Sequence, residues 1–105
     1  MMFLVIQRMK PGLVFTPEMF DPFLTSFKNL KDLEKKGIVK SVWAFVDGSG
    51  GGGIADVPSA DQLYKLLAGS PVSGFVDYEV YPLTSIDVVA ETMRKTKEAV
   101  AKMGK

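Results

Sequence analysis

The sequence predicts an α+β fold, with one four-stranded antiparallel sheet and two helices packed on one of its faces. Apolar runs of strand length alternate with segments of helical periodicity, in the order strand, helix, strand, strand, helix, strand, and a further helical segment follows. This order is the ferredoxin-like plan. The 105 residues, 47% of them hydrophobic, are enough for one small core. We therefore expect a single domain over 1–105, with a ferredoxin-like core over 1–83 and a C-terminal helix over 84–105.

The first strand is expected over residues 2–9, where an apolar run ends at the turn signal Lys10-Pro11-Gly12. Phe3 and Val5 fall on one face of this strand, and apolar residues also occupy the other face, namely Met2, Leu4 and Ile6. A sheet with two apolar faces needs cover on both. We expect a second copy of the chain to cover the face without helices, which predicts a dimeric α+β barrel.

The first helix is expected between Thr16, as N-cap, and Gly37, which ends it. Its apolar residues recur at helical spacing, namely Phe20, Phe23, Phe27, Leu30 and Leu33. Pro22 leaves the start of the helix open, because Asp21 is an alternative cap. A helix in this region is expected in either case.

Residues 38–47 and 53–57 predict the second and third strands, joined by a hairpin loop. The glycine-rich segment between them contains a literal G-x-G-x-x-G, from Gly48 to Gly53. A dinucleotide site needs a helix after the glycines, whereas a strand follows here, so phosphate binding is not expected. The leading expectation is a mobile loop. The alternative is that the glycines remove side chains from a pocket wall, so that a bulky ligand or a neighbouring backbone fits.

The second helix begins after Ser59, which has the capping-box spacing to Gln62, and ends near Gly69. The last strand, over 75–82, alternates between two faces that differ in chemistry. One face has Val76, Tyr78 and Val80, and the other has Phe75, Asp77, Glu79 and Tyr81. This alternation places the two carboxylates on the same face.

The final helix, from Thr84 onward, has apolar residues at a 3-4-3-4-3 spacing that suits a partner surface. These residues are Ile86, Val89, Met93, Thr96, Val100 and Met103. Charged residues on its other side predict a solvated face, with anion binding as the alternative. We expect this helix to build a homodimer or a larger homo-oligomer.

Composition excludes several classes of function. The chain has no cysteine and no histidine, which excludes disulfides, thiolate nucleophiles, Cys or His metal sites and imidazole catalysis. Its formal net charge is +1, so neither nucleic acid nor an anionic membrane is expected as a partner. The apolar N-terminal run is short and has no preceding basic segment, which predicts neither a signal peptide nor a membrane span. We expect a cytoplasmic protein without metal or cofactor.

The segment from Gly37 to Leu83 carries a set of features that occur together elsewhere. A glycine precedes the second strand, Trp43 lies within it, a "DVPS" leads into the short helix, and the last strand has an Asp-x-Glu-Val. This pattern resembles the muconolactone delta-isomerase family. The resemblance implies ferredoxin-like chains that form α+β barrel dimers and larger rings, and that isomerise an unsaturated lactone by proton transfer without a cofactor. In the second strand and hairpin, the isomerases have basic and aromatic side chains including His, where this chain has Ser41, Ala44, Gly48, Ser49 and Gly52.

Proton transfer on a lactone ring needs a base at the acidic carbon and donors at the developing enolate oxygen. Asp77 and Glu79 are the candidate bases, and the alternative is that they face solvent or pair with Lys40 and Arg8. Lys40 and Ser41 occupy polar positions equivalent to those of the family and are candidate donors.

Four further residues are candidates for binding the substrate. Trp43 either packs in the core or forms an apolar wall for a ring, and Gly52 leaves space beside it. Tyr78 and Tyr81 either donate to an oxyanion or are ordinary packing residues.

These residues support three hypotheses about function. The first is an intramolecular isomerase, acting in aromatic compound catabolism on a small unsaturated lactone or an aromatic or polyketide-derived compound. The second is a protein of the same fold that binds a small apolar or aromatic-derived ligand, or acts as an oligomeric scaffold, without catalysis. The third is a cofactor-free monooxygenase, in which Trp43 and the tyrosines bind an electron-rich ring.

Overall fold

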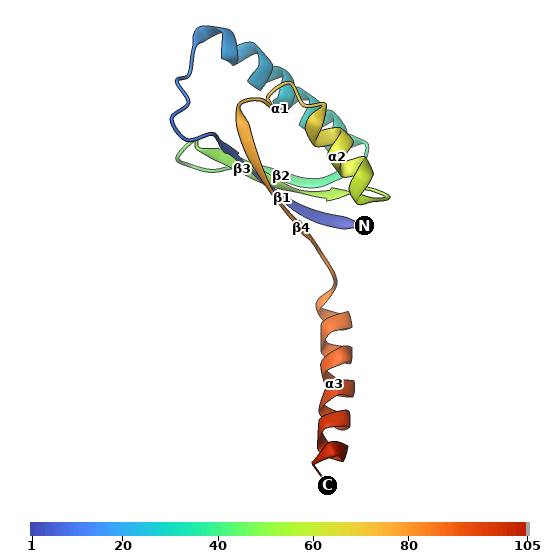
Figure 1. Cartoon of the computed structure of the whole chain (residues 1–105). Coiled ribbons are helices and arrows are strands. Elements are labelled where there is room, and N and C mark those ends of the chain that lie inside the picture. Colours follow the sequence, from blue (N-terminus) through green and yellow to red (C-terminus); the bar gives the residue numbers. More distant parts are fainter. Residues whose placement is uncertain (105) are drawn as a thin grey trace.

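The computed structural model describes residues 1–104, so Lys105, the last residue of the expected C-terminal helix, lies outside the described part of the chain. The elements follow the expected order (Figure 1). They are β1 (Met2–Met9), the 3-10 turn η1 (Pro17–Met19), α1 (Phe20–Lys35), β2 (Val39–Ala44), β3 (Gly50–Asp56), α2 (Ala60–Ala68), β4 (Val76–Pro82) and α3 (Ile86–Met103).

The four strands form one sheet in the order β2-β3-β1-β4, and every neighbouring pair is antiparallel. The helices α1 and α2 lie on the same side of this sheet (Figure 1). This arrangement confirms the predicted α+β, ferredoxin-like fold.

The register of the sheet assigns its residues to two faces. Phe3 lies opposite Ala55, and Val5 lies opposite Gly53; Phe3 and Ala55 are buried beneath α2 in one core cluster, and Val5 packs against it. These residues therefore mark the inner face, which the helices cover. The alternate residues form the outer face. Among residues 1–104, neither core cluster packs a helix or loop against this face.

The core consists of two clusters between the sheet and the helices. The first joins Phe3 and Ala55 to Val57 and Leu63, and the second joins Phe23 of α1 to Val76 of β4. The second cluster also contains Met19 and the fully buried Val72. Burying side chains of this size contributes roughly 1.5–3 kcal/mol each.

The starts of α1 and α2 differ, because only α2 has a side-chain cap hydrogen bond. Thr16 has extended backbone before the 3-10 turn η1, and α1 itself begins at Phe20, which puts Pro22 in the first turn, where a missing N–H costs least. Ser59 accepts a hydrogen bond from the backbone N–H of Gln62 at 3.2 Å, as the capping-box spacing predicts.

The expected loop at Gly50–Gly53 is wrong, because these four glycines are residues of β3. Gly51 and Gly53 lie opposite Gln7 and Val5 of β1, and the same glycines pair with β2 on the other side. The hairpin turn itself is shorter and includes Gly48, which has a φ of 76°. Asp47 accepts hydrogen bonds from the backbone N–H and the hydroxyl of Ser49 there. The ladder hydrogen bonds on both sides hold the glycines in place.

The C-terminal helix α3 projects away from the sheet and the other helices (Figure 1). The radius of gyration is 18.7 Å, whereas a compact chain of this length has about 13 Å.

Within the described residues, no helix is both long and apolar enough to cross a membrane.

Candidate functional site

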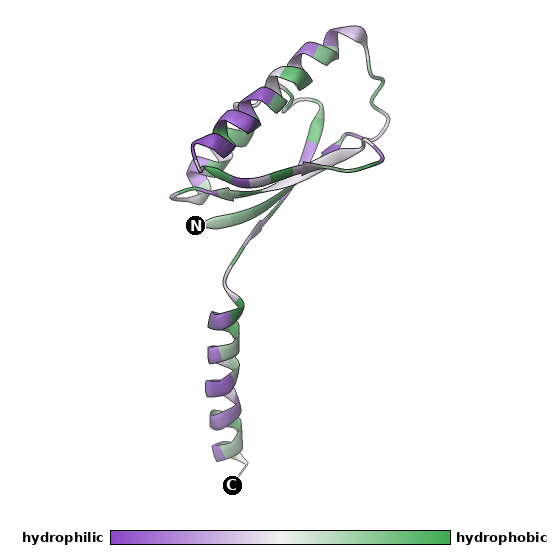
Figure 2. Ribbon diagram, turned by 180° about the vertical axis from the view of Figure 1, so that it is seen from behind, coloured by the Kyte–Doolittle hydropathy of each residue, from purple (hydrophilic) through white to green (hydrophobic). Residues whose placement is uncertain are grey.

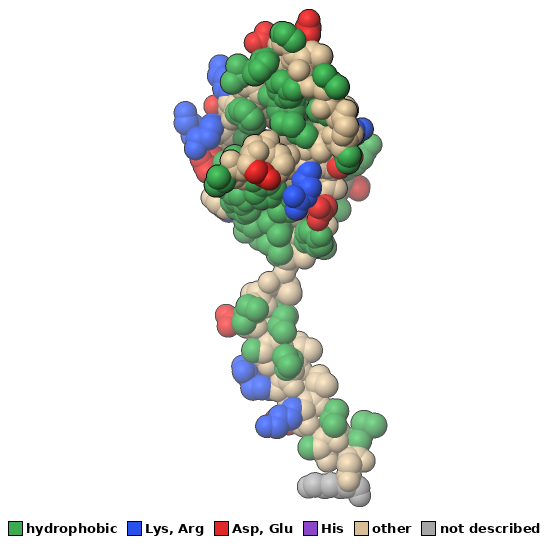
Figure 3. Space-filling model, turned by 90° about the vertical axis from the view of Figure 1, so that its left-hand side faces the viewer, with side chains coloured by type: hydrophobic (Ala, Val, Ile, Leu, Met, Phe, Trp, Pro, Cys, Tyr) green, Lys and Arg blue, Asp and Glu red, His purple; other side chains and the backbone are tan. Residues whose placement is uncertain are grey.

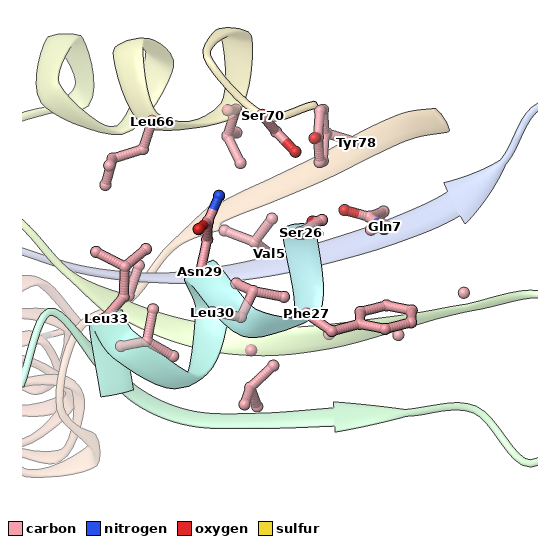
Figure 4. Close-up of a pocket in the computed structure, with 18 of the residues that line it drawn as sticks. Val5, Gln7, Ser26, Phe27, Asn29, Leu30, Leu33, Leu66, Ser70 and Tyr78 are labelled. Carbon is pink, nitrogen blue, oxygen red and sulfur yellow. The ribbon is translucent and has the colours of Figure 1, made fainter. Parts of the chain in front are cut away.

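A cavity of about 590 Å³ lies between the inner face of the sheet and the helices α1 and α2 (Figure 4). Its walls are mainly apolar, with Phe23, Phe27 and Leu30 from α1 and Leu66 from α2. The cavity opens to solvent, because Phe27 is 52% exposed and Leu66 is 38% exposed although both line it. This combination of size and apolar lining is typical of sites for small organic molecules.

Polar side chains gather at one end of the cavity (Figure 4). Gln7 of β1 lies opposite Tyr78 of β4 in the sheet, so their side chains are neighbours on the inner face. Ser26 comes from α1, is 5% exposed and lies near Gln7, while Ser70 follows α2 and lies near Tyr78. A ligand with an oxygen at this end would meet hydroxyl and amide groups.

The hydroxyl of Tyr78 has an unusual environment. Its oxygen is shielded from solvent and has no hydrogen-bond partner among the described residues. Burial raises the pKa of Tyr78 above its usual value, and the nearby Ser70 hydroxyl offsets part of this rise, although the two groups do not reach hydrogen-bond geometry. The phenol therefore stays protonated at neutral pH and has a proton to donate.

The glycines of β3 form part of the cavity floor. All four border the cavity, and none contributes a side chain to it. A Cβ at Gly53 would lie 2.9 Å from the carbonyl oxygen of Ser41, and a Cβ at Gly50 would fall on the carbonyl oxygen of Gln7. The close approach of neighbouring strands therefore accounts for glycine here, as the alternative interpretation of the run expected.

Asp77, Glu79 and Tyr81 lie on the outer face of the sheet, in register with Arg8, Ile6 and Leu4. None of these three borders the cavity. Arg8 Nε donates to Glu79 Oε1 at 3.2 Å, and the Tyr81 hydroxyl donates to Glu79 Oε2 at 2.8 Å. The structure thus brings Glu79 and Tyr81 together, and pairs Glu79 with Arg8, but separates all three predicted site residues from Tyr78 by the thickness of the sheet.

These contacts shift the acidity of both outer-face groups. The hydrogen bond from Tyr81 and then that from Arg8 hold the pKa of Glu79 below its usual value, and the same bond to Glu79 raises the pKa of Tyr81. A carboxylate with a lowered pKa is a weaker base. Glu79 is therefore less suited to abstract a proton than a desolvated carboxylate would be.

Trp43 lies opposite Gly52 on the outer face, and its indole covers that glycine. A Cβ at Gly52 would lie 3.0 Å from atoms of the indole ring. Trp43 is 42% exposed, so it is not a core residue of the single chain. Both residues also border the cavity, since little more than the backbone of β3 separates the two faces there.

Lys40 and Ser41 lie at an irregularity of β2, where the pairing with β3 shifts by one residue. Lys40 Nζ is 3.9 Å from Asp56 Oδ2, and both side chains are largely exposed. Ser41 lies opposite Ile54 on the outer face, like Trp43. Neither residue borders the cavity.

Reasoning from the sequence missed Gln7, Ser26, Ser70 and Asp32, all of which border the cavity. Gln7 shares the inner face with Phe3 and Val5, and Ser26 interrupts the apolar side of α1 beside Phe23 and Phe27. A polar residue at a position that the pattern assigns to the core is therefore the signal that could have identified Gln7 and Ser26. Asp32 is the one carboxylate among the described residues that border the cavity.

Comparisons with known proteins agree with this fold. The sequence matches the family model for muconolactone delta-isomerase over residues 1–87. A crystal structure of muconolactone isomerase superimposes with a TM-score of 0.68 at 23% identity, covering 81% of this chain and 90% of that chain.

A second solved structure is similar to this chain. It is the 5-chloro-2-hydroxyhydroquinone dehydrochlorinase of Burkholderia phenoliruptrix AC1100 in complex with 2,5-dihydroxybenzoquinone, with a TM-score of 0.65 and 18% identity, covering 80% of this chain and 94% of that chain. A comparison with curated proteins gave no significant match. Since the family match spans the whole sheet and both covering helices, the chain belongs to the muconolactone delta-isomerase family.

Proposed function

We propose that the cavity binds an oxygenated and largely apolar ring compound, and that the protein isomerises this compound by moving a proton without a cofactor. The observation that carries the proposal is the Tyr78 hydroxyl, which is shielded from solvent and has no partner among the described residues, on a side chain that borders the cavity. Leaving such a group unpaired costs about 1–3 kcal/mol. A ligand oxygen that displaces the groups shielding this hydroxyl, and accepts its hydrogen bond, would remove that cost.

The chemistry assigned to Tyr78 is donation of a hydrogen bond. When a proton leaves the carbon next to a carbonyl, negative charge develops on the carbonyl oxygen, and a donor already in place stabilises it. The pKa of Tyr78 is raised, so its proton is retained while it donates. The amide of Gln7, which neighbours Tyr78 across the strands, supplies a second donor.

The size of the cavity extends the range of substrates. A volume of about 590 Å³ holds more than one ring. The family name and the dehydrochlorinase with its bound dihydroxybenzoquinone both refer to small oxygenated rings. We therefore include fused aromatic or polyketide-derived compounds beside unsaturated lactones, and place the reaction in the cytoplasmic breakdown of aromatic compounds.

The proposed base is Asp32, because it is the carboxylate that borders the cavity. Asp77 and Glu79 remain the alternative bases that the sequence suggested. They would act from the outer face, on a substrate held against that side of the sheet. Substitution of each carboxylate separates these two arrangements.

The test measures deuterium exchange from D2O into muconolactone, and into a fused-ring lactone, by NMR. We expect Tyr78→Phe to lower the exchange rate at least 10-fold, and Asp32→Asn to lower it about 100-fold or more, as loss of an acid–base group does. The double variant D77N/E79Q is expected to retain the rate. Loss of exchange in D77N/E79Q with full activity in Asp32→Asn would instead assign the base to the outer face.

A second candidate function is ligand binding without catalysis. It is favoured by the environments of the carboxylates, since Asp32 is an exposed residue and Glu79 is held by Arg8 and Tyr81. In that case calorimetry would show that both compounds bind and that Tyr78→Phe weakens the binding. Neither the parent chain nor any variant would catalyse deuterium exchange. Consumption of oxygen with a phenolic substrate would contradict both functions and favour the monooxygenase.

A further inference from the structure

The helix α3 has an apolar side that nothing else in residues 1–104 covers. None of its described residues is buried, and Ile86, Met93 and Val100 are 81%, 66% and 61% exposed. Hydrophobic and hydrophilic residues of α3 lie on opposite sides of the helix (Figure 2), and the space-filling view shows hydrophobic side chains beside a row of basic ones along it (Figure 3). The family match ends at residue 87, so nearly all of this helix lies beyond the matched part of the chain.

A helix in this position needs a partner. Its 18 residues span about 27 Å, and in proteins most of the stability of such a helix comes from packing of its apolar face. Ser85 caps its start by accepting from the backbone N–H of Val88 at 3.1 Å, which supports the helix locally but covers no apolar surface. The apolar side of α3 must therefore be covered by something that the single chain does not supply.

We propose that α3 pairs with α3 of a second copy of this chain, and that the two helices run antiparallel. The apolar residues follow the 3-4 spacing of a two-helix seam. The seam residues are placed symmetrically about the middle of the helix. In an antiparallel pair, Ile86 therefore faces Met103 of the partner, Val89 faces Val100, and Met93 faces Thr96. The heptad positions a and d alternate along this seam. Each contact joins an a position of one helix to a d position of the other, as an antiparallel pair requires.

The charges of α3 favour the antiparallel direction. The first half, residues 86–93, has two acidic residues and no basic one, a net charge of −2. The second half, residues 94–103, has four basic residues and one acidic one, a net charge of +3. An antiparallel pair places each acidic half beside a basic half, whereas a parallel pair places the two basic halves together.

The surface beside the seam allows two helices to approach closely. The residues that flank the seam are mostly small, namely Ala90, Thr92 and Ala99, with Lys97 as the one long side chain. A shallow apolar hollow also lies on this side of α3, bordered by Met93, Thr96, Lys97, Val100 and Ala101. Side chains of a facing helix fit such hollows in paired helices.

Because the natural chain has no cysteine, single cysteines can report the direction of pairing. The full chain would be prepared as Ile86→Cys, as Met103→Cys and as the double variant, and oxidised at low concentration. We expect disulfide-linked dimers from the double variant, and from a mixture of the two single variants. Each single variant alone should stay monomeric on a denaturing gel, since identical positions would lie about 25 Å apart.

Two other results would overturn the proposal. A disulfide dimer from Ile86→Cys alone would show a parallel pair. The absence of any linked dimer, in chains that still self-associate by ultracentrifugation, would show that α3 docks elsewhere, for instance on the outer face of the partner's sheet.

Neighbouring valines provide a matched pair of variants for the seam. Val89 lies in the seam and Val88 lies outside it, and both are exposed in the single chain, at 41% and 55%. We expect Val89→Glu to raise the dissociation constant for self-association at least 10-fold, and Val88→Glu to leave it within about 2-fold. Circular dichroism of both variants checks that the ferredoxin-like core still folds. Equal effects of the two substitutions would contradict a seam at Val89.

Discussion

Replacing Tyr78 by phenylalanine should make the ligand-free protein more stable. The substitution removes a hydroxyl that is shielded from solvent and has no partner among the described residues, and it keeps the ring. An unpaired buried hydroxyl costs about 1–3 kcal/mol. Because Tyr78 as a whole is only half buried, we expect the lower end, a gain of about 1 kcal/mol. For a domain of this size this corresponds to a rise in Tm of about 4 °C or slightly more.

The measurement is urea unfolding and thermal unfolding of both proteins at one fixed concentration, since self-association also contributes to stability. Tyr81→Phe is the matched control. Its hydroxyl donates to Glu79 at 2.8 Å on the exposed outer face, so its loss should lower stability by about 0.5 kcal/mol or less. If Tyr78→Phe is destabilised by about 1 kcal/mol or more, the hydroxyl has a partner within the protein, and the argument for a ligand oxygen fails.

Further changes test the sheet and its outer face. Gly50→Ala should destabilise the protein by more than about 2 kcal/mol in urea unfolding, because its Cβ would meet the Gln7 carbonyl. Gly74→Ala is the control: its Cβ has open space around it, so the change in stability should stay within about 0.5 kcal/mol. Equal effects of the two substitutions would contradict the close approach of the strands. Glu79→Gln should lower stability at pH 7, because the pKa of Glu79 in the folded protein is below the usual 4.5. The ionised carboxylate therefore stabilises the fold above pH 4.5, and this contribution is lost as the pH falls through the pKa of the folded state. The difference from the parent chain should therefore shrink in unfolding measurements as the pH falls below 4.5, and a constant difference would show that the charge of Glu79 plays no part.

Local signals account for most of the fold that could be predicted from the sequence. The cap at Ser59 and the alternation along β4 involve residues close together in the chain, and both are present in the structure. The glycine strand could not be predicted in this way, because residues without side chains have no periodicity to read. Its conformation comes from pairing with β1 and β2, which are distant in sequence.

The site was harder to predict for a related reason. Asp77 and Glu79 were selected by chemical type, since carboxylates are the usual bases when histidine is absent. The alternation correctly separated them from Tyr78, and it contained the further information that Tyr78 shares its face with the buried Val76. Which face carries the cavity depends on where α1 and α2 pack. That packing places Gln7 and Tyr78 at the cavity and leaves the two carboxylates outside it.

The four glycines of β3 are required for different physical reasons. At Gly50 and Gly51 a Cβ would meet backbone carbonyls of the neighbouring strands, so any side chain there would separate the strands. At Gly52 the obstacle is the indole of Trp43, which is a side chain and can move, so a larger residue would change the outer face first. The segment has the glycine spacing of a phosphate-binding loop, yet its glycines affect both faces of a sheet. On the outer face they let the indole of Trp43 lie against Gly52, and on the inner face they leave a floor of bare backbone under the cavity.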